Sequence, residues 1–257
     1  MSSVRNRETP DTRQCQETKV VRDVLCRVRE RYHGPSYYGH TIGALRRVNE
    51  ITRAMGLSLR ERQLARLAVA GHHLECDYGW VKGPQGRERI VKLEESARAS
   101  SLGLSLLINM SMAVTGEELE LVREAVMVTA ADIDDMFETV VQDKLKPDSH
   151  PVVRAVALAD LGAAGMDGPR VFRREACAFL EDRYPDLYRQ KQDRVLRRWL
   201  TLCTHYVCGR QLFLDRELIG LPVLARDAVR SLFSQFYTTY RYLERVREQG
   251  MLRDWFV

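Results

Sequence analysis

The chain has 257 residues, of which 45% are hydrophobic and 29% are charged, a composition typical of a globular protein with a sizeable core. It contains 40 lysines and arginines against 35 acidic residues, and this formal net charge of +5 is spread along the chain. Such a mild excess usually reflects only a solvated surface. It suits an anionic ligand such as a phosphate, but no nucleic-acid-binding motif accompanies it, so nucleic acid is not favoured as a partner.

The chain also lacks the signals of a membrane or secreted protein. No apolar run approaches the roughly 20 residues of a membrane-spanning helix, and the N-terminal segment has no signal-peptide centre. We therefore expect a cytoplasmic protein whose six cysteines are reduced. Cys203 and Cys208 flank His205, but packing of small residues on a helix explains this spacing better than a zinc site does.

Taken in chain order, residues 1–18 are polar and aperiodic, which predicts a flexible N-terminal tail. Beyond them, apolar residues recur at helical spacing almost everywhere. Two capping boxes predict helix starts, at Ser58 and at Thr115. Pro151 suits the first turn of a helix that continues to Asp160. Residues 77–89 contain three glycines and a proline and therefore predict a long surface loop.

Further helices are expected around residues 93–107, 168–182, 186–214 and 222–248. The period-two alternation typical of strands is not sustained anywhere, and the sequence contains no repeat. The predicted fold class is therefore all-α. We expect one helical domain over residues 19–190, with C-terminal helices of residues 191–257 packed on the same domain.

Three histidines are candidates for chemistry. His40 begins one predicted helix, and His72 and His73 follow an apolar run at the end of the next. Alone, His40 is more often a capping or surface residue, and His73 suits a packed or hydrogen-bonded neutral role. Neighbours on a helix point about 100° apart, so His72 and His73 reach one ion only if it lies over the helix end.

Asp160 is a carboxylate inside a segment rich in alanine and valine. Ionised carboxylates are rarely buried without a cation or a hydrogen-bonding partner. A salt bridge to one of the many arginines is one explanation, and metal ligation is the other. The histidines upstream favour metal ligation.

The order His40, His72-His73, Asp160 resembles the H…HD…D pattern of the HD-domain superfamily of metal-dependent phosphohydrolases. Four segments resemble, in order, stretches of its small predicted-phosphohydrolase branch: LAVAGHHLECDYG, LEESA, VMVTAAD and ALADLGAAG. The resemblance covers roughly residues 30–165, and the C-terminal segment RQLFLDRELIGLP is a further candidate for it. It implies an HD-domain-like helical bundle with a metal site at its centre.

The resemblance also implies roles for individual residues. His40, His72 and Asp160 would be metal ligands, with His73 a possible fourth, and Glu95 and Asp132 would lie near the site. Asp77, Glu95 and Asp132 are the candidates for a catalytic base that orients the attacking water. Lys92 or nearby arginines would contact a phosphate.

Two positions depart from the family pattern. His73 stands where the family has an aspartate, and Asp132 stands where the branch has a histidine. A carboxylate can bridge two metal ions, whereas a neutral imidazole binds one ion through one nitrogen. We therefore expect a single divalent ion, and the nitrogen-rich ligand set favours Zn, Fe, Ni or Co over Mg.

Two functions follow from this pattern. The preferred one is a phosphohydrolase that cleaves a phosphate ester or nucleotide through a metal-activated water. The alternative is a degenerate, inactive HD domain that binds a ligand or a protein partner in a regulatory role, and His73 is its main support. The expected partner is a small phosphate-containing ligand, no membrane is involved, and a homo-oligomer is left open.

Overall fold

The computed structural model describes residues 10–32, 35–82, 86, 88–134 and 139–256. Over these residues the fold is an all-α helical bundle, as predicted, with two small antiparallel sheets of two strands each. The helices are α1 (Pro10–Arg31), α2 (Pro35–Ala54), α3 (Leu59–Gly71), α4 (Glu94–Ser111), α5 (Gly116–Met127), α6 (Pro151–Asp160), the π-helix η1 (Ala163–Asp167), α7 (Pro169–Arg183), α8 (Pro185–Gln190), α9 (Asp193–Glu217), α10 (Val223–Leu232), α11 (Phe236–Glu248) and α12 (Leu252–Trp255). The strands are β1 (Tyr78–Lys82), β2 (Glu88–Lys92), β3 (Asp132–Ile133) and β4 (Val140–Val141).

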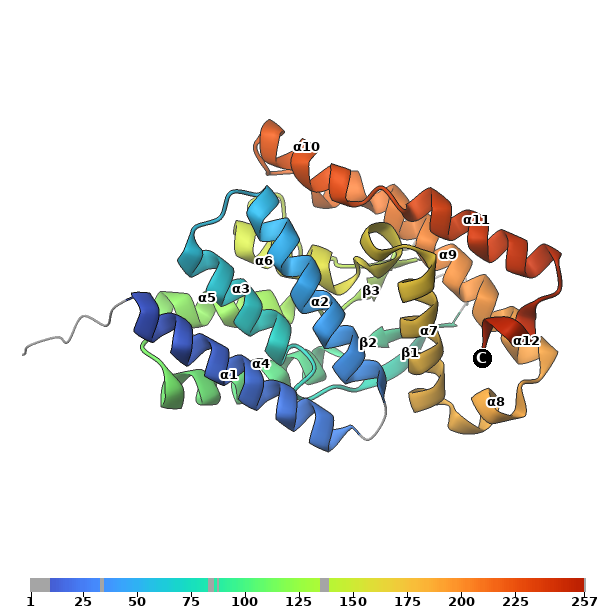
Figure 1. Cartoon of the computed structure of the whole chain (residues 1–257), viewed down its shortest axis with the longest axis horizontal. Coiled ribbons are helices and arrows are strands. Elements are labelled where there is room, and N and C mark those ends of the chain that lie inside the picture. Colours follow the sequence, from blue (N-terminus) through green and yellow to red (C-terminus); the bar gives the residue numbers. More distant parts are fainter. Residues whose placement is uncertain (1–9, 33–34, 83–85, 87, 135–138, 257) are drawn as a thin grey trace, which may run out of the picture.

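Helices α3 and α6 form the centre of the bundle (Figure 1). Helix α3 packs against α1, α2, α5 and α6, and α6 packs against α2 and α5 as well. From its second residue to its last, α6 is buried. Its alanines and valines are small enough for neighbouring helices to approach closely on all sides, which explains how a short helix fills the core.

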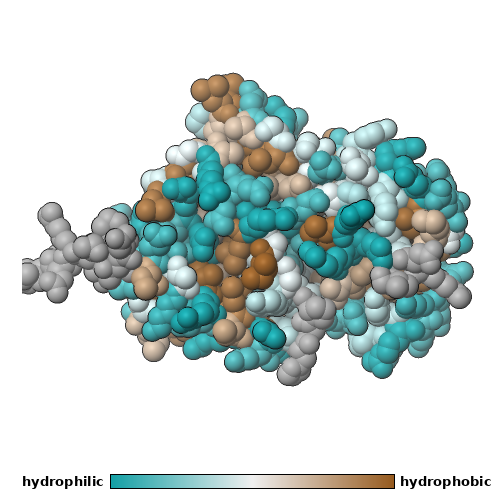
Figure 2. Space-filling model, in the orientation of Figure 1, coloured by the Kyte–Doolittle hydropathy of each residue, from teal (hydrophilic) through white to brown (hydrophobic). Residues whose placement is uncertain are grey.

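The C-terminal helices cover another side of the bundle (Figure 1). Helix α11 packs against α7 and α9, and α10 contacts α2. The visible surface in Figure 2 is mainly hydrophilic, with hydrophobic patches at α10 and near the middle of this face. On α10, Val223 and Leu224 are exposed. In the part of the chain that the structure describes, no helix combines the length and apolar character needed to cross a bilayer.

The helix starts predicted from capping residues are confirmed. The side chains of Ser58 and Thr115 each accept a hydrogen bond from the backbone N–H of the third helical residue, which is Glu61 or Glu118. The carboxylate of that glutamate accepts a hydrogen bond from the backbone N–H of the capping residue. Pro151 occupies the first turn of α6, and His150 caps that helix. These local signals act within four residues, which is why the sequence alone reveals them.

The predicted N-terminal tail is wrong for residues 10–18, because α1 begins at Pro10. Residues 1–9 lie outside the described residues. Glu17 is buried, and its Oε1 accepts a hydrogen bond of 2.8 Å from Nε of Arg66 on α3. At this position of α1 the buried side chain is therefore charged rather than apolar.

The predicted loop over residues 77–89 is also wrong in part, since β1 and β2 form a hairpin. Tyr78 lies opposite Lys92 in this hairpin. Gly79 permits the close approach of the following chain, because a Cβ there would lie 2.7 Å from Cδ2 of Leu93. A glycine within a strand marks such a close approach, so Gly79 belongs to a strand and not to a turn.

We expect Glu17→Gln to lower the free energy of unfolding by about 1–3 kcal/mol, because it leaves the Arg66 guanidinium without its charged partner. Urea denaturation measures this loss. Glu30→Gln, at an exposed position on the same helix, is the matched control. Equal stability of the two variants would show that α1 is not held to α3 through Glu17.

Candidate metal centre

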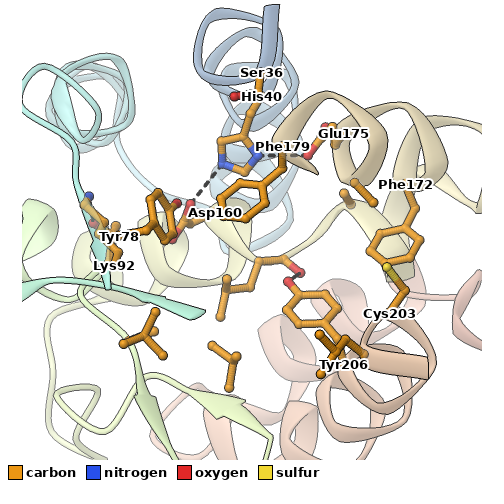
Figure 3. A pocket seen from close by; sticks show the side chains of 18 of the residues that line it. Ser36, His40, Tyr78, Lys92, Asp160, Phe172, Glu175, Phe179, Cys203 and Tyr206 are labelled. Carbon is orange, nitrogen blue, oxygen red and sulfur yellow. Dashed lines mark hydrogen bonds and ion pairs between the residues drawn. The ribbon is translucent and has the colours of Figure 1, made fainter. Parts of the chain in front are cut away.

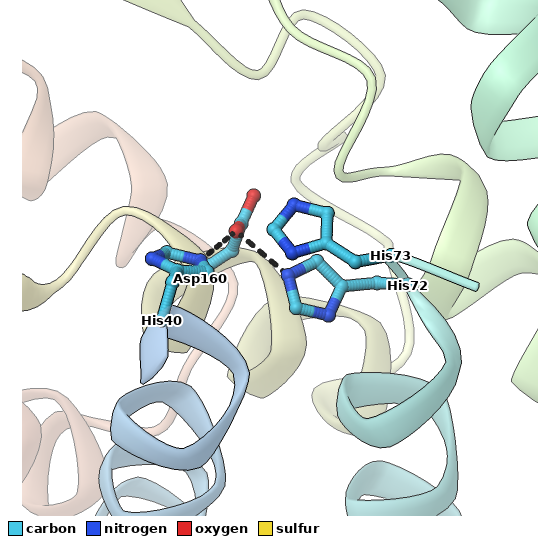
Figure 4. A group of neighbouring side chains, drawn as sticks. All are labelled: His40, His72, His73 and Asp160. Atoms are coloured by element: carbon cyan, nitrogen blue, oxygen red, sulfur yellow. Dashed lines mark hydrogen bonds and ion pairs between the residues drawn. The ribbon is translucent and has the colours of Figure 1, made fainter. Parts of the chain in front are cut away.

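Four side chains from three helix ends or turns converge on one point (Figure 4). His40 comes from the second turn of α2, His72 caps α3, His73 follows it, and Asp160 is the last residue of α6. Each offers a potential ligand atom, and these atoms all lie within 4.8 Å of one another. Residues that are up to 120 positions apart in the chain therefore share one site.

The two adjacent histidines reach the site because α3 ends directly before them, at Gly71. A Cβ on Gly71 would lie 2.6 Å from Cδ2 of Leu104, so glycine lets α4 pack closely against this helix end. The rings of His72 and His73 stack at 3.8 Å beyond the last turn. Both rings therefore reach the site from the end of α3.

His72 presents an unprotonated nitrogen to the site. Its Nδ1 lies 2.5 Å from the carbonyl oxygen of Val69, which can only accept, so Nδ1 carries the proton. Burial lowers the pKa of His72, and the neutral ring keeps a lone pair on Nε2. Nε2 is buried and lies 3.2 Å from Oδ1 of Asp160, but this contact lacks the direction of a hydrogen bond.

The carboxylate of Asp160 presents a lone pair toward Nε2 of His72. Burial alone would raise the pKa of its carboxyl group, but the hydrogen bond from His40 and the proximity of His72 outweigh burial and lower that pKa well below its usual range. Oδ1 lies 3.0 Å from Nε2 of His40. Two buried acceptors, Nε2 of His72 and Oδ1 of Asp160, thus face each other, which is unfavourable unless a cation lies between them.

The distances between these atoms suit one metal ion. Bonds of about 2.0–2.2 Å in a tetrahedral arrangement place neighbouring ligand atoms about 3.4 Å apart. The contacts of 3.0 and 3.2 Å from Asp160 to the two histidines are close to that value. The ligand atoms of the whole cluster lie within 4.8 Å of one another, so His40, His72 and Asp160 are close enough to share one ion.

His40 is oriented by Glu175 of α7 (Figure 3). Nδ1 of His40 lies 2.8 Å from Oε2 of Glu175. Although burial lowers the pKa of His40, the carboxylates of Glu175 and Asp160 raise it to about 9, so the metal-free ring carries a proton at neutral pH. A histidine whose far nitrogen donates to a carboxylate is the arrangement that fixes the tautomer and direction of metal-binding imidazoles.

Arg47 hydrogen-bonds to the residues that position His40 and Asp160. It is fully buried and donates from Nη1 to Glu175 (3.0 Å) and to Asp167 (2.7 Å). Its Nε donates to the carbonyl oxygen of Ala159 (2.7 Å), the residue before Asp160. Burial alone would raise the pKa of Glu175, but Arg47 and His40 lower it to about 2. One guanidinium therefore positions both the partner of His40 and the backbone that carries Asp160.

Sequence reasoning missed Arg47 and Glu175. Arg47 follows His40 by two helical turns and so lies on the same face, a spacing that could have marked it. Glu175 carries no such local signal, because its relation to His40 spans 135 residues and depends on how α7 packs against α2.

His73 is the weakest member of the cluster. Thr41 Oγ1 donates to the carbonyl oxygen of Tyr37, so toward His73 it acts as an acceptor, and it lies 3.5 Å from Nδ1. Nε2 of His73 lies 3.4 Å from the hydroxyl of Tyr78. Burial and the neighbouring His72 lower the pKa of His73 well below its usual range. His73 is therefore a neutral, packed ring that makes two long contacts with hydroxyl groups.

A cavity of about 230 Å³ opens beside the cluster, and His40, His73, Asp160 and Glu175 line it. Lys92 of β2 lines it as well, across the hairpin from Tyr78. Nζ of Lys92 donates to the carbonyl oxygen of His72 (2.5 Å) and to Oγ1 of Thr129 (2.7 Å). An ammonium group has three donors, so one N–H remains for a ligand.

The three candidate bases lie elsewhere. Asp77 is two-thirds exposed and pairs with Arg183 at 2.6 Å. Glu95 faces solvent, and Asp132 is exposed beside a separate recess. Among the described residues that line the cavity, none is one of these three. In α4 it is Ser96, one position beyond Glu95, that turns inward and accepts a hydrogen bond from Asp77 N.

The chain matches no protein-family model, no curated protein and no solved structure. The donor atoms of the site indicate which metal ion it could bind. Two imidazole nitrogens and one carboxylate oxygen suit zinc, iron, nickel or cobalt, whereas magnesium prefers oxygen ligands.

Glu175→Gln is expected to weaken zinc binding by about 10- to 100-fold, because the variant loses the charge that orients His40. Competition with a chelator of known affinity measures the change. Glu181→Gln, an exposed glutamate on the same helix, is the control and should bind zinc like the unaltered protein. Unchanged zinc affinity in Glu175→Gln would contradict the positioning role of Glu175.

Proposed function

We propose that this protein is an HD-domain-like phosphohydrolase with a single metal ion that cleaves a phosphate ester. The observation that carries the proposal is the buried lone pair of His72 Nε2, which faces Oδ1 of Asp160 at 3.2 Å beside a cavity. The order of His40, His72 and Asp160 in the sequence, which resembles that of the HD-domain superfamily, agrees with this assignment.

The chemistry follows from the roles of the chain's own groups. A divalent ion bound at such a site supplies Lewis acidity, which lowers the pKa of a water and polarises a phosphoryl oxygen. Glu175 keeps the proton of His40 on Nδ1, so Nε2 is available as a ligand. The negative charge of Asp160 offsets part of the charge of the ion.

Donors for the phosphoryl oxygens line the same cavity. The remaining N–H of Lys92 is one of them. The hydroxyls of Ser36 and Tyr37 are two more: both residues are 5% exposed, and neither hydroxyl has a hydrogen-bond partner within the described part of the chain. Buried donors without partners are costly unless a ligand or water satisfies them, which supports an oxyanion as the ligand.

His73 supports one ion rather than two. Its ring is neutral and makes contacts with hydroxyls of Thr41 and Tyr78. An imidazole in this state cannot bridge two ions as a carboxylate does. The proposed reaction therefore uses one ion, with Lys92 and the hydroxyls sharing the stabilisation of the phosphoryl group.

One observation favours the alternative, an inactive HD-like domain that binds a ligand. Asp77, Glu95 and Asp132, the candidate bases, are exposed to solvent. If activation of the water requires a separate carboxylate base, the site binds the metal and a phosphate without turnover. The two functions share the site and differ in turnover alone.

Turnover by the zinc- or cobalt-loaded protein against phosphomonoesters and nucleotides separates them. We expect hydrolysis of at least one phosphate ester, and a fall of about 100-fold or more in kcat/KM for His40→Gln, because the ion loses a ligand. His150→Asn is the matched histidine control, since asparagine preserves the helix cap and His150 lies outside the cavity lining. Absence of hydrolysis in the metal-loaded protein would favour the alternative.

In the same experiment His73→Asp restores a carboxylate that can bridge ions. We expect this variant to bind more than one ion per chain without a large gain in activity. Two ions already bound to the unaltered protein would contradict the role given to His73.

A further inference from the structure

We propose that the ligand of this cavity is a phosphate monoester whose organic part is uncharged and mainly apolar. The phosphoryl group would lie at the histidine end and the organic part at the opposite end. This inference rests on the proposed function and adds the chemical class of the substrate.

The cavity has two chemically different ends (Figure 3). Its charged end carries His40, Asp160, Glu175 and Lys92. The rest of the lining is mainly apolar or aromatic, apart from hydroxyls and His205. It includes Leu161, Phe172, Phe179, Trp199, Leu202 and Tyr206. An elongated ligand with one anionic and one apolar end matches this distribution.

Two stacked aromatic pairs form the apolar wall between α7 and α9. Phe179 stacks on Trp199 with ring centres 5.9 Å apart and planes 8° apart. Phe172 stacks on Tyr206 at the same separation and 9°. The hydroxyl of Tyr206 donates to the carbonyl oxygen of Leu161, so this ring is left as an apolar surface.

The aromatic wall continues to the charged end. The ring of Phe179 meets the ring of Tyr78 edge to face at 4.9 Å. The hydroxyl of Tyr78 in turn lies 3.4 Å from Nε2 of His73. One ligand could therefore contact the metal cluster and the Phe179–Trp199 pair at the same time.

The lining argues against a substrate with a longer phosphate chain. Lys92 is the single lysine or arginine among the described residues of the cavity wall. A nucleoside di- or triphosphate would bring further negative charges, and burying them without cations is costly. At the apolar end, Nε1 of Trp199 is a buried donor without a partner in the described chain. It would suit one acceptor on the organic part.

Binding of phosphonates, which are not hydrolysed, tests this class directly. The probes are phenylphosphonate and methylphosphonate, together with the non-hydrolysable β,γ-imido analogue of adenosine triphosphate, each titrated calorimetrically into the zinc-loaded protein. Burial of the phenyl ring should make phenylphosphonate bind about 10-fold or more tightly than methylphosphonate. Equal affinity for phenylphosphonate and methylphosphonate, or tighter binding of the triphosphate analogue, would overturn the inference.

Two variants test which residues cause the preference for phenylphosphonate over methylphosphonate. Trp199→Ala should reduce the ratio of the methylphosphonate Kd to the phenylphosphonate Kd by about 10-fold, because a stacking surface is lost. Tyr237→Ala removes an exposed aromatic ring of α11 and should leave this ratio unchanged. An unchanged ratio in a folded Trp199→Ala protein would overturn the inference.

Leu202→Arg is a second variant that adds a cation to the apolar end. It should weaken phenylphosphonate binding and strengthen binding of the triphosphate analogue. If it alters neither affinity, the apolar end is not the binding site and the inference fails.

The phosphonate titration also separates this inference from the proposed function. A protein that prefers phenylphosphonate but hydrolyses no phosphate ester supports the ligand class and overturns the hydrolase assignment. A protein that hydrolyses glycerol phosphate as well as phenyl phosphate and shows no phenylphosphonate preference overturns the ligand class alone.

Discussion

A buried carboxylate needs positive charge, and Asp160 ends a helix that is apolar apart from Arg154. The groups nearest to Oδ1 are imidazoles, His40 on one side and His72 on the other. His40 supplies a proton in the metal-free protein. His72 cannot, because its proton lies on Nδ1, toward the carbonyl oxygen of Val69. A cation between His72 and Asp160 relieves this conflict, and a divalent ion that displaces the His40 proton satisfies all three residues at once.

Charges of alternating sign extend this arrangement into the fold. Behind Asp160 come His40, then Glu175, then Arg47 and finally Asp167, each in contact with the next. The chain of contacts joins α6, α2, α7 and η1, so the directions of the ligands depend on the packing of four helices. A site positioned by rigid elements holds its geometry better than one positioned by loops.

The parts of this structure that the sequence predicts are those with local causes. The capping residues Ser58 and Thr115 act within one turn, and the helical period follows from which residues are buried. Asp160 was recognisable because a lone carboxylate in an apolar helix is a local anomaly. Glu175 was not, since its role depends on the packing of α7 against α2. Glu95 and Ser96 differ by one position in helical phase, and sequence order alone cannot choose which of them faces inward.

The position of a bound ion tests the central claim most directly. Crystals of the protein purified with zinc, measured at the zinc absorption edge, would locate the ion by its anomalous scattering. The account predicts one ion per chain, at bonding distances of about 2.0–2.2 Å from His40 Nε2, His72 Nε2 and an oxygen of Asp160. A zinc-saturated protein with no ion at this point, or with two ions there, would contradict it.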